Sequence, residues 1–291
     1  MTETLRDNDP LGSLDSDPIT GPITDPITDP ITDRDGSDDA RQPVIRVRDL
    51  YKSFGDHHVL RGVSFGLHAG ENLVVLGRSG TGKSVLIKVL VALLAPDAGE
   101  VEIFGQRIHD LKQRDQDRLR LRLGFAFQHA ALYDGMTVRE NLAFPLEMNR
   151  RDLSHAAIAE RVEQMARAVG LPHTLEQTPA QLSGGQRKRI GIARTLILEP
   201  AVMLYDEPTA GLDPETSAQI NELILEVQQN YGTSSIVITH DLTCAKTVGD
   251  RVLVLADGEV LSEGQFDDVF DTEDPRLRSF YDYNFTEQTV A

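Results

Sequence analysis

The sequence predicts an α/β fold in which helices cover both faces of a parallel sheet. Three short, nearly continuous apolar runs are typical of central strands in such a sheet: ENLVVLG (71–77), AVMLYDE (201–207) and SIVITH (235–240). Between them, residues 154–169 and 214–231 carry apolar side chains at helical spacing, and each segment is followed by a glycine that suits a helix end. Strands that alternate with helices indicate an α/β architecture.

Along the chain, three regions differ in composition. Residues 1–42 form an acidic tail in which DPIT-GPIT-DPIT-DPIT repeats over positions 17–32, and proline at this density predicts disorder. The globular domain, 43–270, begins with VIRVRDL (44–50), which alternates like a strand with one buried face. Asp257-Gly258, between two apolar runs, predicts a tight hairpin turn. Residues 271–291 form a C-terminal extension.

Composition excludes several functions. The formal net charge of -17 argues against non-specific nucleic-acid binding, which needs basic patches to meet phosphate. Cys244 is the single cysteine, so no internal disulfide and no cysteine-based metal cluster can form. The first residues show no secretory signal, and the longest apolar stretch (85–95) is interrupted by Lys88 and is too short to span a bilayer. We therefore expect a cytoplasmic protein that reaches a membrane only through partners.

A phosphate-binding loop follows the first apolar run. The pattern GxxxxGK[ST] is met by Gly77, Arg78, Ser79, Gly80, Thr81, Gly82, Lys83 and Ser84. Glycines let backbone N–H groups turn inward around an anion, and the N-terminus of the following helix adds partial positive charge. We expect Lys83 to reach the β- and γ-phosphates of ATP and the Ser84 hydroxyl to ligate Mg²⁺.

Two adjacent carboxylates end the second apolar run. Asp206 and Glu207 are expected at the carboxyl end of a buried strand, where open α/β sheets bind ligands. Asp206 would hold Mg²⁺, and Glu207 would act as the general base that polarises the attacking water. Taken alone, the pair could also be a surface turn, but the phosphate loop in the same chain favours the catalytic interpretation.

The segment LSGGQ, followed by RKRIGIARTL, resembles the signature sequence of the ABC ATPase family. Ser183 and the backbone amides of Gly184 and Gly185 would form a second anion cradle at a helix N-terminus, with Gln186 completing the motif. The resemblance implies that the signature of one chain closes on ATP held by a second copy. It also implies a RecA-like P-loop NTPase core (about 43–108 and 182–265), an antiparallel β subdomain and an inserted helical subdomain (about 109–181).

Other family elements follow in order. Phe54 resembles the aromatic residue that stacks on adenine, with Tyr51 as the alternative. Gln128 resembles the glutamine that meets Mg²⁺ and water while its loop touches the membrane subunit. Asp213 resembles the residue that communicates across the dimer, and it is also a natural N-cap before Pro214. His240 resembles the switch histidine that contacts the γ-phosphate.

Finer details resemble one branch of the family. Val85 after the phosphate loop, FQHAALYDGMTVRENLAFPL after the glutamine and the closing DPRLRSFYDY resemble the ATPases of Mla-type phospholipid-trafficking systems. This resemblance implies an integral membrane permease and an Mce-type substrate-binding protein as partners, phospholipid as cargo, and a peripheral position on the inner face of the cell membrane. The alternatives are an ATPase for amino-acid or lipoprotein transport, and a regulatory ATPase acting on a cell-wall enzyme complex. A soluble family member acting on DNA or ribosomes is disfavoured by the acidic charge and the single ATPase unit.

Overall fold

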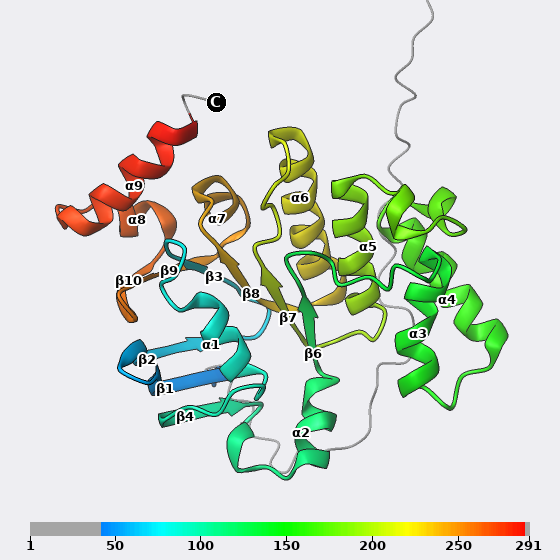
Figure 1. Ribbon diagram of the computed structural model, residues 1–291, viewed down its shortest axis with the longest axis horizontal. Coiled ribbons are helices and arrows are strands. Elements are labelled where there is room, and N and C mark those ends of the chain that lie inside the picture. The colour runs from blue at the N-terminus through cyan, green and yellow to red at the C-terminus, as the bar shows by residue number, and fades with distance from the viewer. Residues whose placement is uncertain (1–41, 289–291) are drawn as a thin grey trace, which may run out of the picture.

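Two sheets organise the part of the chain that the computed structural model describes, residues 42–288 (Figure 1). The larger sheet has six strands in the order β10-β9-β3-β8-β7-β6. Neighbouring strands from β9 to β6 pair in parallel, and only β10 is antiparallel. The DPIT repeat at 17–32 lies outside the described residues.

The strands of this sheet include the three apolar runs that predicted it. The sheet consists of β3 (Asn72–Leu76), β6 (Leu123–Ala126), β7 (Val202–Asp206), β8 (Ser234–Thr239), β9 (Arg251–Ala256) and β10 (Glu259–Gly264). Every residue of β3 and β8 is buried, as expected for central strands that are covered on both faces. Asp257 (φ 50) and Gly258 (φ 79) both adopt left-handed backbone conformations in the β9–β10 turn, so the predicted hairpin is confirmed.

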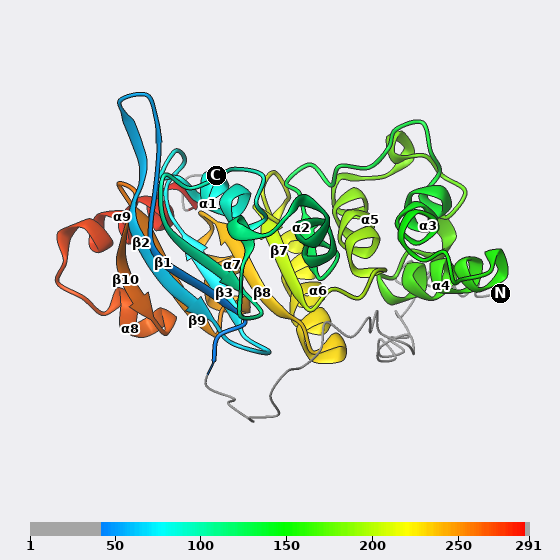
Figure 2. The same cartoon turned by 90° about the horizontal axis from the view of Figure 1, so that it is seen from below.

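The smaller sheet is antiparallel, with the order β2-β1-β4-β5. Its strands are β1 (Ile45–Phe54), β2 (His57–Leu67), β4 (Ala98–Ile103) and β5 (Gln106–Arg107). In β1, Ile45 and Val47 are buried and Arg46 between them is more exposed, which confirms the alternation read from the sequence as far as Val47. A register shift then follows, with Asp49 at φ 45, so the next buried residue is Leu50 rather than Asp49. Figure 2 shows this sheet stacked beside the strands of the larger one.

Alternate residues of the central strands face two separate cores. Leu73 and Val75 pack toward the antiparallel sheet and α1 (Lys83–Leu90). Val74 and Leu76 pack on the other face, in a core that includes residues of α5 (Gly184–Leu196) and α6 (Pro214–Tyr231). Burial of each such side chain contributes about 1.5–3 kcal/mol, so both faces hold the larger sheet in place.

Helix ends follow the capping signals of the sequence. Ser154 caps α4 (His155–Ala168) by accepting a hydrogen bond from the backbone N–H of Ala157. Gly232, at φ 61, ends α6 in the left-handed conformation that glycine adopts without strain. The remaining helices are α2 (Gln113–Arg120), α3 (Val138–Asn149), α7 (Leu242–Val248), α8 (Phe266–Phe270) and α9 (Pro275–Gln288), with single 3₁₀ turns at Ile108–Asp110, Pro172–Thr174 and Pro179–Gln181.

The predicted helical subdomain, about 109–181, is not wholly helical. Within it, β6 pairs in parallel with β7 and forms the edge of the six-stranded sheet. Gly124 lies in β6 where a Cβ would come within 2.5 Å of Met203 Sδ, so this strand approaches β7 too closely for a larger residue. The helices α3 and α4, which follow β6 in this range, lie at the opposite end of the molecule from α8 and α9 (Figures 1 and 2).

Within residues 42–288, no helix is both long enough and apolar enough to cross a membrane.

Candidate functional site

The phosphate-binding loop connects β3 to α1 and is shaped by its glycines. Gly82 precedes the helix at φ 101, and a Cβ there would lie 2.9 Å from the carbonyl oxygen of Val59. A Cβ on Gly77 would lie 2.6 Å from the carbonyl oxygen of Leu255. Gly80 is at φ 84 with nothing within 4 Å of a Cβ position. Gly77 and Gly82 are therefore needed because neighbouring backbone packs against them, and Gly80 is needed because of its positive φ.

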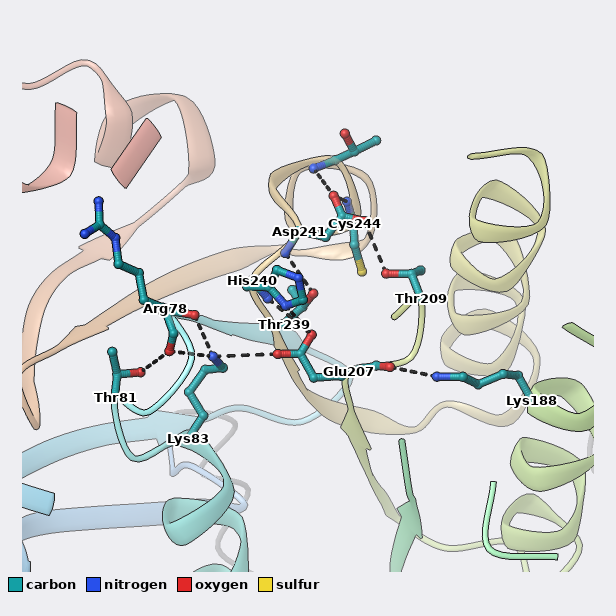
Figure 3. A network of polar contacts seen from close by, with 12 residues as sticks. Arg78, Thr81, Lys83, Lys188, Glu207, Thr209, Thr239, His240, Asp241 and Cys244 are labelled. Carbon is teal, nitrogen blue, oxygen red and sulfur yellow. Dashed lines mark hydrogen bonds and ion pairs between the residues drawn. The ribbon is translucent and has the colours of Figure 1, made fainter. Parts of the chain in front are cut away.

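Lys83 is the buried cation of this loop. Its side chain is 7% exposed, and its Nζ donates hydrogen bonds to the carbonyl oxygens of Gly77 (2.5 Å) and Arg78 (3.0 Å). The same Nζ lies 3.6 Å from Glu207 Oε1 (Figure 3). Burial lowers the pKa of Lys83, and the neighbouring carboxylates of Glu207 and Asp206 partly oppose that shift. A phosphate group in the loop would offer this ammonium a full counter-charge.

Glu207 lies directly after β7 in a strained backbone conformation, φ 49. Its backbone N–H donates to the carbonyl oxygen of Ile238 at 2.8 Å, which ties it to the end of β8. Its carboxylate is 13% exposed and pairs with His240, with Glu207 Oε2 2.9 Å from His240 Nδ1. Left-handed backbone at a residue with a long side chain is uncommon and concentrates at functional sites.

Glu207 and His240 shift each other's pKa values. Burial alone would raise the pKa of Glu207, but the hydrogen bond and charge of His240, together with Lys83, hold that pKa below its usual range. The pKa of His240 is raised, mainly by its hydrogen bond to Glu207. The pKa of Asp206 is raised by burial and then by the adjacent Glu207.

One pocket, of about 850 Å³, contains most of the predicted nucleotide-binding and catalytic residues. Phe54 lines it and is 50% exposed, whereas the alternative, Tyr51, does not line it. Because half of Phe54 is accessible, its ring is available for a base to stack upon. The other predicted residues in the lining are Arg78, Ser79, Gly80, Gly82, Lys83, Ser84, Gln128, Asp206, Glu207 and His240.

Thr81 faces a different side of the loop. Its hydroxyl donates to the carbonyl oxygen of Arg78 at 2.9 Å, and it lines a neighbouring pocket rather than the one described above. Thr81 therefore stabilises the loop, and its part in nucleotide binding stays a prediction.

The predicted signature lies apart from this pocket. Ser183 caps α5 in a reciprocal capping box, in which Ser183 Oγ accepts from Gln186 N–H at 3.2 Å and Gln186 Oε1 accepts from Ser183 N–H at 2.9 Å. None of the residues 183–186 lines the nucleotide pocket. A Cβ on Gly185 would lie 2.4 Å from Thr216 Cγ2, so α5 and α6 are packed closely at this point.

Asp213 has the capping role that its sequence context predicts. Its Oδ1 accepts from Thr216 N–H at 2.9 Å, and its Oδ2 accepts from Thr216 Oγ1 at 2.7 Å. These hydrogen bonds lower the pKa of Asp213. Asp213 does not line the nucleotide pocket, and its role between two chains stays a prediction.

The structure adds residues that sequence reasoning missed. His57, Val59 and Phe280 line the nucleotide pocket, and Lys188 of α5 donates a hydrogen bond to the carbonyl oxygen of Glu207. Ser279 of α9 accepts hydrogen bonds from Arg78 of the phosphate loop, at 3.3 Å to Oγ and 3.4 Å to the carbonyl oxygen. No sequence pattern links these positions to the loop.

The donor set at the pocket fits Mg²⁺. Ser84, Gln128 and Asp206 offer a hydroxyl, an amide oxygen and a carboxylate to the same space. Mg²⁺ prefers such oxygen ligands and keeps several water molecules besides one or two protein groups and substrate phosphates. The ion would supply neutralisation of phosphate charge.

Comparison with known proteins places this arrangement in a family. A family model described as ABC transporter matches residues 60–210. The chain is 41% identical over 253 residues to the protein TRIGALACTOSYLDIACYLGLYCEROL 3 of Arabidopsis thaliana, a chloroplast protein, and the match covers 81% of this chain and 73% of that protein. It is 40% identical over 232 residues to the methionine import ATP-binding protein MetN of Mesorhizobium japonicum, covering 80% of this chain and 63% of MetN.

Solved structures agree with the family match. The protein cbiO1 of Clostridium perfringens, part of the ABC transporter complex cbiONQ, aligns with a TM-score of 0.73 at 31% identity over 82% of this chain and 94% of that one. The ATP-binding cassette MJ0796, solved as a dimer bound to ADP and Pi in a post-hydrolysis state, aligns with a TM-score of 0.70 at 31% identity over 76% of this chain and 98% of that one. The fold is therefore that of an ABC ATPase, and this chain belongs to the ABC transporter family as an ATPase that uses ATP and Mg²⁺.

Proposed function

We propose that two copies of this chain bind two ATP molecules between them and that hydrolysis drives a separate integral membrane permease. The main support for a dimer is that the two predicted anion-binding sites, the phosphate loop and the start of α5, lie apart within one chain. The phosphate loop lines the nucleotide pocket, whereas Ser183 and the two glycines after it begin a helix outside that pocket. A second copy can supply the missing cradle, and the dimeric MJ0796 structure with ADP and Pi supports this arrangement.

The hydrolytic step uses charges that are already assembled. Glu207 orients and deprotonates the attacking water, while Lys83 and His240 stabilise negative charge on the phosphate oxygens. In the structure the Glu207 carboxylate pairs with Lys83 and with His240. ATP phosphates would draw Lys83 and His240 toward themselves and release the carboxylate toward the water.

For the cargo, we propose phospholipid moved between bacterial membranes with the help of an Mce-type substrate-binding protein. The relative at 41% identity bears the name of a glycerolipid, trigalactosyldiacylglycerol, which supports a lipid cargo. Methionine import relatives at 38–40% identity support the second candidate, amino-acid import. In either case the chain would sit on the cytoplasmic face of the cell membrane, held by its permease.

The test is to purify the C-terminally tagged full chain with its membrane partners in mild detergent and identify bound proteins and lipids by mass spectrometry. A polytopic permease with an Mce-type protein and phospholipid supports the proposal. A permease with an amino-acid-binding protein supports the second candidate and overturns the lipid cargo. A permease for lipoproteins, or a membrane protein joined to a cell-wall enzyme, overturns both cargo assignments.

A further inference from the structure

Lys188 is a half-buried cation that the hydrolytic step above does not use. It lies in α5, five residues after the capping residue Ser183. Its Nζ donates a 2.9 Å hydrogen bond to the backbone carbonyl oxygen of Glu207 (Figure 3). Burial lowers the pKa of Lys188, and the charges of Glu207 and Asp206 oppose that shift.

Lys188 bonds to Glu207, whose backbone conformation is strained. Glu207 has φ 49, a conformation that an L side chain rarely adopts, and surrounding contacts have to maintain it. Its N–H is held by Ile238, and its carbonyl oxygen accepts from both Lys188 and the N–H of Ala210, the latter at 3.2 Å. Lys188 is thus one of three groups that hold the main chain of Glu207, and the only one of the three that comes from α5.

The position of Lys188 on α5 joins two functional regions. An α-helix rises 1.5 Å per residue, so Lys188 lies about 7.5 Å along the helix from Ser183. The capping box makes the first turn continuous with the rest of the helix, and the close approach of Gly185 to Thr216 leaves little room for bending there. A displacement of the Ser183 end is therefore transmitted to the Lys188 hydrogen bond.

We propose that Lys188 is a positioning residue that couples the two ATP sites of the dimer. This inference rests on the proposed function, in which Ser183 meets the ATP of the partner copy while Glu207 acts on ATP held by its own chain. When the partner's nucleotide engages the start of α5, Lys188 adjusts the carbonyl of Glu207 and with it the direction of the Glu207 carboxylate. Each site then reaches its hydrolytic geometry only when the other is filled.

The test compares Lys188→Met, which keeps the stem and removes the donor, with Lys188→Arg, which keeps a charged donor. Steady-state ATPase rates are measured against ATP concentration, together with the dissociation constant for ATP and the melting temperature. Losing a hydrogen bond from a charged donor predicts a kcat about ten- to a hundredfold lower in Lys188→Met. We expect an unchanged dissociation constant for ATP, a Hill coefficient that falls toward one, and partial rescue in Lys188→Arg. Lys246→Met is the matched control, because Lys246 pairs with Asp267 on the exposed face of α7.

Two results would overturn the proposal. The first is a kcat and a Hill coefficient in Lys188→Met that equal those of the wild type. The second is a loss of ATP binding together with a lower melting temperature, because that combination indicates a purely structural role. Dimer formation is measured separately, by light scattering of Glu207→Gln and of Glu207→Gln/Lys188→Met with ATP. If both dimerise while Lys188→Met hydrolyses like the wild type, only the coupling role is wrong. If Glu207→Gln itself stays monomeric with ATP, the proposed dimer is wrong.

Discussion

Glu207→Gln is the substitution that most directly tests the hydrolytic site. Glutamine has nearly the same shape as glutamate and keeps an oxygen that can accept from the backbone N–H of His240, which the structure places 3.4 Å from Glu207 Oε2. It loses the negative charge that pairs with Lys83 and His240 and the ability to take a proton. We therefore expect ATP binding to survive and turnover to fail.

The magnitude follows from the state of the carboxylate. The hydrogen bond and charge of His240, together with Lys83, hold the pKa of Glu207 below its usual range, which would make it a weak base. If phosphate draws Lys83 and His240 away, burial raises the pKa of Glu207 toward a value suited to proton transfer. The full contribution of a general base then applies, about 10²–10⁴ in kcat, or about 3–5 kcal/mol of transition-state stabilisation.

The assay is phosphate release by the purified variant at saturating MgATP, combined with calorimetric titration of ATP. Glu222→Gln, on the exposed side of α6, is the control for loss of one negative charge. A variant with normal turnover refutes the assignment of Glu207 as base. A variant that loses ATP binding along with turnover refutes the argument that the carboxylate acts on water rather than on nucleotide.

Further predictions concern the cations, the metal and the C-terminal helix. Lys83→Met should weaken ATP binding about ten- to a hundredfold by calorimetry, because the γ-phosphate loses a charged donor; unchanged affinity would contradict this. His240 should titrate above its ordinary pKa of 6.5 in proton NMR, and Glu207→Gln should bring that pKa down. Because the pKa of His240 is raised in the folded state, the His240–Glu207 pair stabilises the fold fully below pH 6.5. This contribution to the free energy of unfolding is lost as pH rises through the folded-state pKa of His240. We expect that loss in the wild type and not in Glu207→Gln. Chelation with EDTA should abolish ATPase activity, and added Mg²⁺ should restore it. Phe280→Ala should change the KM for ATP, because Phe280 lines the nucleotide pocket; Tyr281→Ala, on the same helix, is the control.

Much of the nucleotide site could be predicted because its parts are local in sequence. Eight consecutive residues specify the phosphate loop, since its turns depend on glycines at fixed positions and its anion site on the N-terminus of the next helix. Asp206 and Glu207 could be placed because a buried strand of a parallel sheet directs its carboxyl end toward the ligand edge. The three central strands and the cap at Asp213 followed from equally local patterns.

Other features depend on which segments pack together. The sequence range predicted as helical conceals β6, because four residues that include a glycine carry too little pattern to identify an edge strand. The contact of Lys188 with Glu207 spans 19 positions, and that of Arg78 with Ser279 spans 201. Such contacts form only when the helices pack on the sheet.

The amino-acid sequence by itself determined the class of fold, the phosphate loop and the acidic strand end, because short-range backbone geometry and hydrophobic periodicity suffice for each. Only the tertiary structure decided that α9 contributes Phe280 to the lining of the nucleotide pocket and that Lys188 bonds to the backbone of Glu207. It also decided that the signature helix starts outside that pocket. The physical reason is that each of these depends on the relative placement of elements far apart along the chain, which the packing of two buried cores sets.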